Sequence, residues 1–516
     1  MAKNIVLCSD GTGKRGGSGN DTNVYKLYRA VDIHNSKQPQ VTFYENGVGT
    51  NVDGEALKQN KFWRALSGAF GFGFEQHVRD MYEYLVMNYQ PGDRIYLCGF
   101  SRGASIVRAF AGMLHTCGLL NIYDASGNRK NRREIQKLID QAILAYRKRR
   151  KDAAIAEAYK REHAVKDDEF APEGSLKIHF IGVWDTVSAL GFPQDWSILI
   201  NKSFAFLDKL TEEIWPHHYY NFRLNDDIAY ACQALAIDDQ RETFFPRVWR
   251  EQGRTDGSVE QVWFTGVHSN VGGGYPRSGL SNVGLEWMMQ RAKKHGVVFI
   301  DDALKDAHDY ANVHGKLYDS RDGIAIYYRY LPRDIETICE QRLNDKVKIH
   351  DTVMARIKRG TASYAPGFLP QEFDVVDTAG KKISSIRQDP GAYGQNRKAV
   401  LVQVNRLRWL YRIFVESTVI LLAIIIGFWV NPPDSILSAA GSCEAFFLFS
   451  WIHALLTYIL PGMFGNFLTY ILCVHAWIFV VMLAIAYAMF RYRKTCRIAL
   501  SRALMNTRDE ILQYWK

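Results

Sequence analysis

A serine, an aspartate and a histidine each follow a short apolar run in this sequence, and these are the side chains of nucleophilic ester chemistry. The serine, Ser101, stands between Gly99 and Gly103 in a G-x-S-x-G pattern, with an apolar run before it and an alanine-rich run after it. This pattern is typical of a sharp strand-to-helix turn that exposes a nucleophilic serine. The two glycines are needed because larger side chains would collide with the neighbouring strand and helix.

A serine hydroxyl at its ordinary pKa is a poor nucleophile, so Ser101 needs a histidine base and an acid beside it. The run 177–184 leads directly into Asp185, and the run 261–267 leads directly into His268. In an open sheet of parallel strands, functional groups gather at the carboxyl ends of the strands. The chain order Ser101, Asp185, His268 is also the order of α/β-hydrolases. We therefore predict these three as the catalytic residues, with Asp238 and Asp239 as alternative acids.

Developing negative charge on the substrate needs hydrogen-bond donors, and backbone N–H groups at strand ends can supply them. The Arg102 N–H, at the start of the helix after Ser101, is one predicted donor. The glycine-rich segment 9–14 (SDGTGK) follows the first apolar run, so Gly11 or Thr12 is expected to supply the second.

No metal or other cofactor is expected from the motifs present. The sequence has no H-E-x-x-H pattern and no Cys/His cluster, and its eight cysteines include no C-x-x-C pair. Reduced cysteines in a cytosolic domain are the simplest interpretation.

These residues require an α/β fold to position them. Expected strands at 4–8, 40–44, 94–98, 177–184 and 261–267 alternate with helical stretches such as 71–89. This alternation predicts a mostly parallel sheet with helices on both faces, as in α/β-hydrolases. We expect residues 1–300 to form the catalytic domain and residues 301–410 a helical layer and juxtamembrane linker.

The chain changes character after residue 410. Two apolar stretches, 413–430 and 468–490, are long enough to cross about 30 Å of hydrocarbon as helices. Arginines and lysines precede the first and follow the second, whereas 431–467 has neither. The positive-inside rule therefore predicts a membrane region at 411–492 with both flanks, including a basic tail at 493–516, in the cytoplasm. The third apolar stretch, 445–460, is expected to be interfacial or re-entrant, because a third crossing would place one basic flank on the wrong side.

A basic segment at about 126–170 interrupts the predicted catalytic domain. It has helical propensity and is rich in arginine and lysine, so we expect a helical insertion with a solvated face. Adhesion to anionic lipids is an alternative, and a lid over the active site is another. The net charge of +10 fits a membrane surface, and nucleic acid is not an expected partner because no recognised binding module surrounds the charges.

Seven segments resemble the uncharacterised α/β-hydrolase domain family that includes phospholipase effectors of bacterial type VI secretion. They are 9–14 (SDGTGK), 22–31 (TNVYKLYRAV), 44–50 (YENGVGT), 99–104 (GFSRGA), 183–187 (VWDTV), 234–246 (ALAIDDQRETFFP) and 266–275 (GVHSNVGGGY). The resemblance implies Ser101 as nucleophile, His268 as base and Asp185 as acid, acting on fatty-acyl esters of glycerophospholipids. The basic insertion and the C-terminal apolar hairpin depart from the family pattern.

The leading hypothesis is a phospholipase A type serine esterase, anchored at the inner, cytoplasmic membrane with its catalytic domain and C-terminus in the cytoplasm. This would be a bacterial effector or defence enzyme of lipid metabolism, with membrane phospholipids as substrate and a regulatory or inhibitor protein or a second copy of the chain as further partners. One alternative keeps the serine mechanism but acts on a non-phospholipid ester or thioester. Another is a non-catalytic membrane scaffold or toxin.

Overall fold

The expected alternation of strands and helices is present in the computed structural model. It describes residues 2–48, 73–187, 224–431 and 447–515, with short gaps at 125, 150–151, 167–173, 175, 252–253, 255, 341, 344–345 and 461. The end of the YENGVGT segment, Cys443 and the start of the 445–460 stretch lie outside the described residues.

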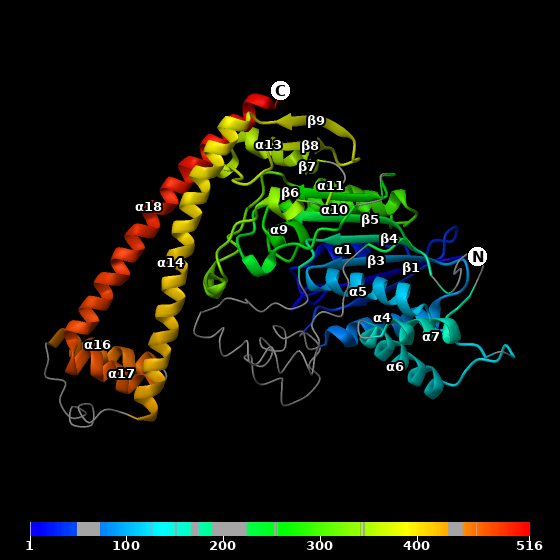
Figure 1. Ribbon diagram of the computed structural model, residues 1–516, viewed down its shortest axis with the longest axis horizontal. Coiled ribbons are helices and arrows are strands. Elements are labelled where there is room, and N and C mark those ends of the chain that lie inside the picture. The colour runs from blue at the N-terminus through cyan, green and yellow to red at the C-terminus, as the bar shows by residue number, and fades with distance from the viewer. Residues whose placement is uncertain are drawn as a thin grey trace.

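One nine-stranded sheet forms the centre of the molecule, in the order β2-β1-β3-β4-β5-β6-β7-β8-β9 (Figure 1). Neighbouring strands are parallel except for β8 and β9, which are antiparallel. The strands are β1 (Asn4–Ser9), β2 (Gln40–Glu45), β3 (Arg94–Phe100), β4 (Ile178–Trp184), β5 (Ile228–Ala236), β6 (Val259–Phe264), β7 (Val347–His350), β8 (Glu372–Val376) and β9 (Lys382–Arg387). All five expected strands are therefore present.

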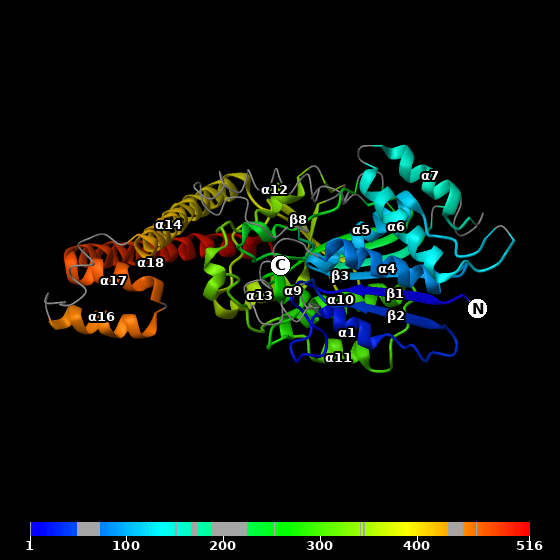
Figure 2. The same ribbon diagram turned by 90° about the horizontal axis from the view of Figure 1, so that it is seen from below.

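Both faces of the central strands are buried, because successive side chains point to opposite sides. Ile5 and Leu7 of β1 face one apolar cluster, and Val6 and Cys8 face the other. The first cluster is closed by α4 (Phe74–Asn88), α5 (Arg102–Cys117), α6 (Arg132–Lys148) and α7 (Ala153–His163). The second is closed by α1 (Asn23–Ala30), α10 (Gly279–Lys294) and α11 (Ala303–Asp309) on the other side of the sheet (Figure 2).

The described part of the basic insertion contains helices α6 and α7, which pack against α4 and α5. Ile135, Ile139 and Ala142 of α6 are buried in the core beside α4 and α5. Tyr146 of α6 donates a hydrogen bond to the carbonyl of Ala109, in the middle of α5. The described helices of the insertion are thus a layer of the α/β domain, packed against α5.

Residues 301–410, expected to be a helical layer, contain strands as well as helices. The described helices include α11, α12 (Ile335–Cys339), α13 (Asp351–Arg359) and the start of the long helix α14 (Pro390–Val430), but β7, β8 and β9 extend the sheet. These strands are four to six residues long, and β9 is largely exposed, so their apolar patterns are weak. The expectation of helices alone was wrong for this reason.

A long helical hairpin leaves the sheet at its β9 end (Figure 1). It consists of α14 (Pro390–Val430) and α18 (Ala476–Tyr514), with α16 (Phe447–Ile459) and the short α17 (Gly465–Thr469) at its far end. Both near ends are fixed to the α/β domain. Arg397 of α14 pairs with Asp334, and Arg508 of α18 donates to the carbonyl of Ile357 at 3.1 Å.

Among the described residues, α14 is the helix long and apolar enough to cross a membrane, with an 18-residue window of mean hydropathy 2.4. The predicted second span, 468–490, is not a straight helix. The helical segments 465–472 and 477–514 meet at 95°, and together they meet the same length and composition criteria. The break lies at His475, where the backbone is non-helical and α18 begins one residue later.

Candidate active site

Ser101 lies at the tip of the strand-to-helix turn that the sequence predicts. It follows β3, precedes α5 and has a φ of 58°, a left-handed value that is unusual for a residue other than glycine. A Cβ on Gly103 would lie 2.1 Å from the carbonyl oxygen of Ser9, and one on Gly99 would lie 2.7 Å from the Cα of Ala104. The two glycines are therefore required by the close approach of β1, β3 and α5.

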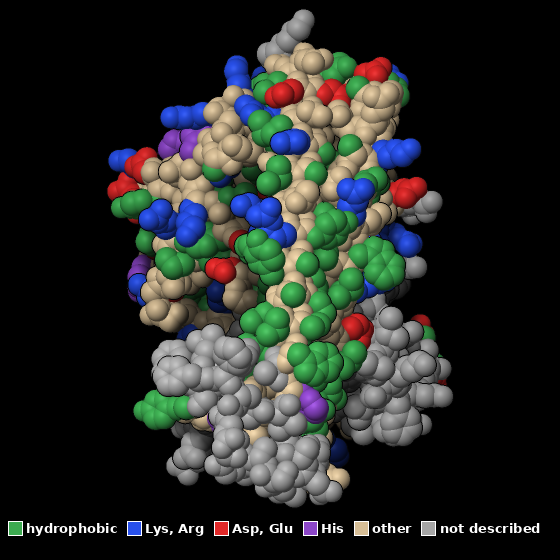
Figure 3. Space-filling view, turned by 90° about the vertical axis from the view of Figure 1, so that its left-hand side faces the viewer, with side chains coloured by type: hydrophobic (Ala, Val, Ile, Leu, Met, Phe, Trp, Pro, Cys, Tyr) green, Lys and Arg blue, Asp and Glu red, His purple; other side chains and the backbone are tan. Residues whose placement is uncertain are grey.

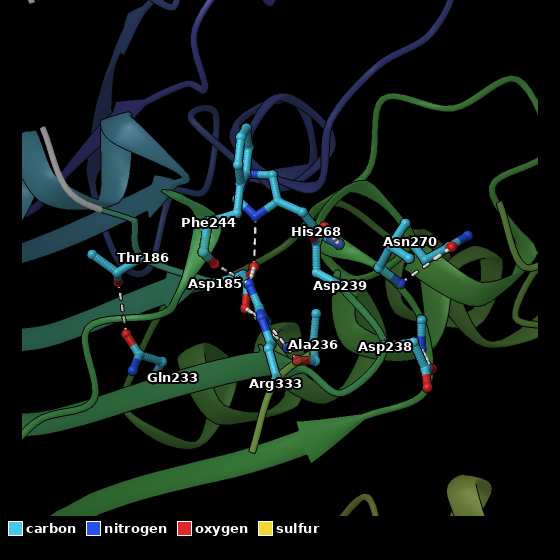
Figure 4. Close-up of polar contacts among 12 residues, drawn as sticks. Asp185, Thr186, Gln233, Ala236, Asp238, Asp239, Phe244, His268, Asn270 and Arg333 are labelled. Atoms are coloured by element: carbon cyan, nitrogen blue, oxygen red, sulfur yellow. Dashed lines mark hydrogen bonds and ion pairs between the residues drawn. The ribbon is translucent and has the colours of Figure 1, made fainter. Parts of the chain in front are cut away.

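Asp185 and His268 lie together at the carboxyl edge of the same sheet (Figure 4). Asp185 directly follows β4, and His268 begins α9 (His268–Gly272), which follows β6. The Nδ1 atom of His268 is 2.5 Å from Oδ2 of Asp185, and both side chains are buried. The Oδ1 atom of Asp185 also accepts the Ala236 N–H at 3.0 Å. Asp185 thereby fixes the orientation of the imidazole.

Arg333 holds Asp185 from the side opposite His268, and the sequence analysis missed it. Its guanidinium donates two hydrogen bonds to the Asp185 carboxylate, at 2.7 Å to Oδ1 and 2.8 Å to Oδ2 (Figure 4). It also donates to the carbonyls of Ala236 and Phe244. Both charged side chains have no exposed surface. Arg333 follows Pro332 in an irregular segment, and no local motif marks it.

Arg333 also decides the charge state of Asp185. Burial raises the pKa of a carboxyl group, but the Arg333 charge and the hydrogen bonds from His268 and Arg333 lower the pKa of Asp185 well below its usual value. For His268, burial is the largest influence and lowers the pKa, although the Asp185 carboxylate opposes the shift. The pair is thus a carboxylate beside a neutral imidazole at neutral pH.

The second ring nitrogen of His268 is available for chemistry. Its Nε2 atom is buried and has no hydrogen-bond partner among the described residues. The ring of Phe100, the residue before Ser101, packs at 4.6 Å from the imidazole, so the nucleophile and the histidine are neighbours. No hydrogen bond between Ser101 and His268 is present in the described part of the chain, and such bonds often tighten only when substrate binds.

The alternative acids, Asp238 and Asp239, have other partners. Asp239 pairs with Arg241 at 2.7 Å and accepts the backbone N–H of His268 at 3.1 Å, so it positions the histidine's main chain. Asp238 accepts hydrogen bonds from the Gly266 N–H and the Tyr364 hydroxyl. Burial raises the pKa of Asp238 to about 6. Neither carboxylate contacts the imidazole ring within hydrogen-bond distance, so Asp185 remains the predicted acid.

Of the two predicted donors in the 9–14 loop, the structure favours Thr12. The Gly11 N–H is already bonded to the Asp10 carboxylate at 2.6 Å, whereas neither the N–H nor the hydroxyl of Thr12 has a partner among the described residues. A Cβ on Gly11 would lie 3.2 Å from the Cβ of Ser101, so this loop lies against the nucleophile. The Arg102 N–H, in the first turn of α5, is also without a partner in the described structure.

The position of this loop follows from the strand order. β1 lies between β2 and β3 in the sheet. The chain therefore leaves β1 towards α1 on one face and leaves β3 towards α5 on the other, which opens a crevice at the carboxyl ends of these two strands. Asp10 fixes the loop there by accepting the Thr22 and Tyr44 hydroxyls, each at 2.6 Å.

The family model described as "T6SS, Phospholipase effector Tle1-like, catalytic domain" matches residues 3–291, more than half of the chain. The chain belongs to this family. The resemblance expected from the seven segments is confirmed. The match covers the region in which Ser101, Asp185 and His268 lie and ends before Arg333 and the hairpin.

Individual relatives are distant. An uncharacterized protein of Saccharomyces cerevisiae is 31% identical to this Tle1-like chain over 209 residues, which are 37% of the chain and 28% of the yeast protein. An uncharacterized protein from Pseudomonas aeruginosa of known structure is 17% identical, with a TM-score of 0.33, over 81% of this chain and 60% of its own. The Tle1 effector bound to the VgrG spike of the type 6 secretion system is 14% identical, with a TM-score of 0.34, over 63% of this chain and 78% of its own. The chain thus spans only part of the length of these proteins.

Proposed function

We propose that this chain is a membrane-anchored serine hydrolase that cleaves fatty-acyl esters of glycerophospholipids, in the manner of a phospholipase A. The observation that carries the proposal is the Asp185–His268 pair, held by Arg333 at the same sheet edge as the Ser101 turn. A neutral imidazole with a buried, unpartnered Nε2 is a suitable general base for a neighbouring hydroxyl.

In the proposed reaction, the Ser101 Oγ attacks the ester carbonyl carbon while His268 Nε2 accepts the hydroxyl proton. The tetrahedral oxyanion accepts hydrogen bonds from the Arg102 and Thr12 N–H groups. His268 then gives its proton to the departing glyceryl oxygen, which releases the lysophospholipid and leaves an acyl-Ser101 ester. Water, deprotonated by His268, then attacks the acyl ester, and His268 returns the proton to the Ser101 Oγ as the fatty acid leaves.

The Arg102 side chain supports a phosphate-bearing substrate. Its Nη1 atom is buried and has no hydrogen-bond partner among the described residues, and burial lowers the pKa of the guanidinium to about 10. The side chain lies within electrostatic reach of Tyr328, whose ring packs against Phe244 at 5.5 Å. The Phe244 ring in turn lies 5.0 Å from the His268 ring, measured between centroids. Tyr328 and Phe244 thus connect the Arg102 side chain to the histidine base. Because the Arg102 Nη1 has no acceptor among the described residues, the guanidinium can bind the phosphodiester of a headgroup.

Membrane anchoring is proposed from the surface of the hairpin. Ile420, Leu422, Ile424 and Ile426 of α14 are 43–49% exposed, and Val480, Leu483 and Ile485 of α18 are 52–56% exposed. Apolar surface of this extent usually marks a lipid or protein contact. The basic residues flanking both helices favour the cytoplasmic side of an inner membrane for the catalytic domain.

The test is release of fatty acid and lysophospholipid from mixed-lipid liposomes by the detergent-purified full-length protein. Ser101→Ala and His268→Ala should each lower the rate about a thousandfold or more, because each removes a participant in every turnover. Retention of most activity in Ser101→Ala would exclude the serine mechanism. Labelling of Ser101 by a fluorophosphonate without lipid release would indicate a different ester substrate.

A further inference from the structure

A cavity of about 1140 Å³ lies between the α/β domain and the helical hairpin, apart from Ser101. It is larger than most small-molecule pockets, which measure about 300–1,000 Å³. Its walls come from α14, α18 and the irregular segments near 317–333 and 361–368, and neither Ser101 nor His268 lines it. The proposed reaction leaves this cavity without a role.

The two ends of the cavity along the hairpin differ in chemistry. Ile420 and Ile424 of α14 and Met482 and Ile485 of α18 line the end that lies within the predicted membrane spans. Arg493 and Arg497 of α18, together with Arg321, line the cavity nearer the α/β domain. Figure 3 shows the same division on the outer surface, with basic side chains on the upper part of the column and hydrophobic ones below.

The arginines carry an excess of positive charge. Arg321 is held in place by hydrogen bonds to the carbonyls of Ile326 and Tyr328. Arg493 is half-buried and Arg497 is exposed, and neither makes a hydrogen bond or ion pair with any described residue. Burial and the charge of Arg497 lower the pKa of Arg493, and Asp319 is the carboxylate near these three cations that opposes this shift. Such a cluster favours an anion between its members.

The spacing of charge and apolar surface matches a lipid in one leaflet. Eight residues separate Ile485 from Arg493 on α18, which is about 12 Å at 1.5 Å per residue. One leaflet is about half of the roughly 30 Å hydrocarbon thickness. If residues near 485 lie at acyl-chain depth, the arginines lie near the headgroup phosphates. Basic pockets between membrane helices on the cytoplasmic side are known to favour anionic headgroups.

We propose that this cavity binds one anionic glycerophospholipid, with its phosphate at Arg321, Arg493 and Arg497 and its acyl chains along α14 and α18. The bound lipid is a ligand distinct from the substrate at Ser101. This inference rests on the proposed membrane anchoring but not on the proposed catalysis. The inner end of the cavity is lined by Val267, which precedes His268, and by Arg333.

The binding experiment uses full-length Ser101→Ala protein in neutral detergent, titrated with diether phosphatidylglycerol or diether phosphatidylcholine, which a phospholipase A cannot cleave. Native mass spectrometry counts the bound lipids. One phosphatidylglycerol should be retained per chain, at least tenfold more tightly than phosphatidylcholine. Arg493→Gln with Arg497→Gln should abolish this preference, because both unpaired guanidiniums are removed.

Arg491→Gln with Arg502→Gln is the matched control, since these arginines are exposed on the same helix and do not line the cavity. This variant should bind phosphatidylglycerol as the parent does. An equal loss in the control would mean general surface attraction, and equal binding of phosphatidylcholine would exclude the headgroup site. Competition by glycerol phosphate at the same concentration as lipid would identify a soluble phosphate site instead.

Ile424→Trp tests the apolar part independently of the charges and should weaken phosphatidylglycerol binding by filling the cavity. Unchanged binding in this variant would contradict the acyl-chain placement. The melting temperature of each variant, measured by circular dichroism, reports whether it is folded. Failure of catalysis alone would leave the lipid count in the Ser101→Ala protein unchanged, so the two proposals fail separately.

Discussion

At the scale of single residues, Arg333 determines whether Asp185 can serve His268. In Arg333→Met the buried carboxylate would lose two charge-assisted hydrogen bonds, and the pKa of Asp185 would rise. A carboxyl group whose pKa is lower in the folded state than in the unfolded state stabilises the fold at pH values above its unfolded pKa, which is about 3.9 for aspartate. This stabilisation is lost as the pH falls through the pKa of the folded state. We therefore expect the acid limb of kcat/KM to move to higher pH and the free energy of unfolding to fall by about 3–5 kcal/mol.

Arg291→Met is the control for this prediction. Arg291 is also a buried arginine, paired with Glu260 at 2.9 Å on the helix α10, away from the candidate active site. It should lose comparable stability in chemical denaturation without moving the pH profile. A shifted profile in both variants would assign the effect of Arg333 to general loosening of the fold.

The pKa of His268 predicts how the enzyme behaves in acid. Burial lowers this pKa, so the neutral base should persist below pH 6.5, the ordinary midpoint of histidine. The rate of Ser101 labelling by a fluorophosphonate should therefore reach half its maximum below pH 6.5 and decline only at lower pH. A midpoint above 7 would show that the Asp185 carboxylate outweighs burial.

Sequence reasoning identified Ser101, Asp185 and His268 as candidates because Asp185 and His268 directly follow predicted strands, Ser101 lies in the turn after another, and parallel strands end at one edge. It also predicted Gly11 or Thr12 as an oxyanion donor and could not choose between them, since the bond from the Gly11 N–H to Asp10 depends on a side-chain rotamer. Arg333 could not be found in this way. It comes 148 residues after Asp185 and enters from a loop with no periodic pattern.

At the scale of secondary-structure elements, the turn before α5 depends on how closely that helix approaches β1. A methyl group in Gly103→Ala would meet two carbonyl oxygens, of Ser9 and Asp10, at 2.1 and 2.5 Å. Because these are backbone atoms, α5 must move and carry Ser101 with it. We expect loss of most Ser101 labelling and a lower melting temperature in a thermal scan.

Gly394→Ala gives the matched control for this substitution. Gly394 lies in α14, and a Cβ there would meet no atom within 4 Å. Because alanine is favoured over glycine in a helix by about 1 kcal/mol, this variant should be as stable as the parent or more so. If it lost Ser101 labelling as Gly103→Ala does, the steric argument would be wrong.

A substitution in helix α6 tests whether this helix is a structural layer of the α/β domain or a lid over the candidate active site. Ile139 is fully buried in the core shared with α4 and α5. Ile139→Ala should lower the free energy of unfolding by about 2–5 kcal/mol, measured by urea denaturation, and leave kcat on liposomes unchanged where the protein is folded. A rise in kcat without loss of stability would instead support a lid.

The elements that sequence reasoning missed have a common physical character. β5 is rich in alanine, which has little preference for strands, and β7 is only four residues long. They are strands because they pair with neighbours already in the sheet, which is a property of the tertiary structure. The break of the second apolar stretch at His475 likewise has no glycine or proline to mark it.

At the scale of the whole molecule, the hairpin and the α/β domain should have separable roles. Replacing residues 413–490 by a flexible Gly/Ser linker removes the exposed apolar surface but keeps the helix ends that contact the domain. The variant should appear in the soluble fraction and keep Ser101 labelling. Its rate on liposomes, divided by its rate on short-chain esters, should be at least tenfold lower than the same ratio for the parent. Equal liposome activity would exclude anchoring as the source of substrate access.

The last turns of α18 belong to the core of the α/β domain. Ile511 is fully buried beside β7, β8 and β9, although it follows both apolar stretches, 413–430 and 468–490, in the sequence. A ribosome therefore delivers Ser101, Asp185, His268 and Arg333 well before the side chain that completes the packing under β9. In the proposed membrane-anchored hydrolase, the α/β domain would therefore finish folding only after the hairpin has been synthesised, so activity would appear after the hairpin has left the ribosome.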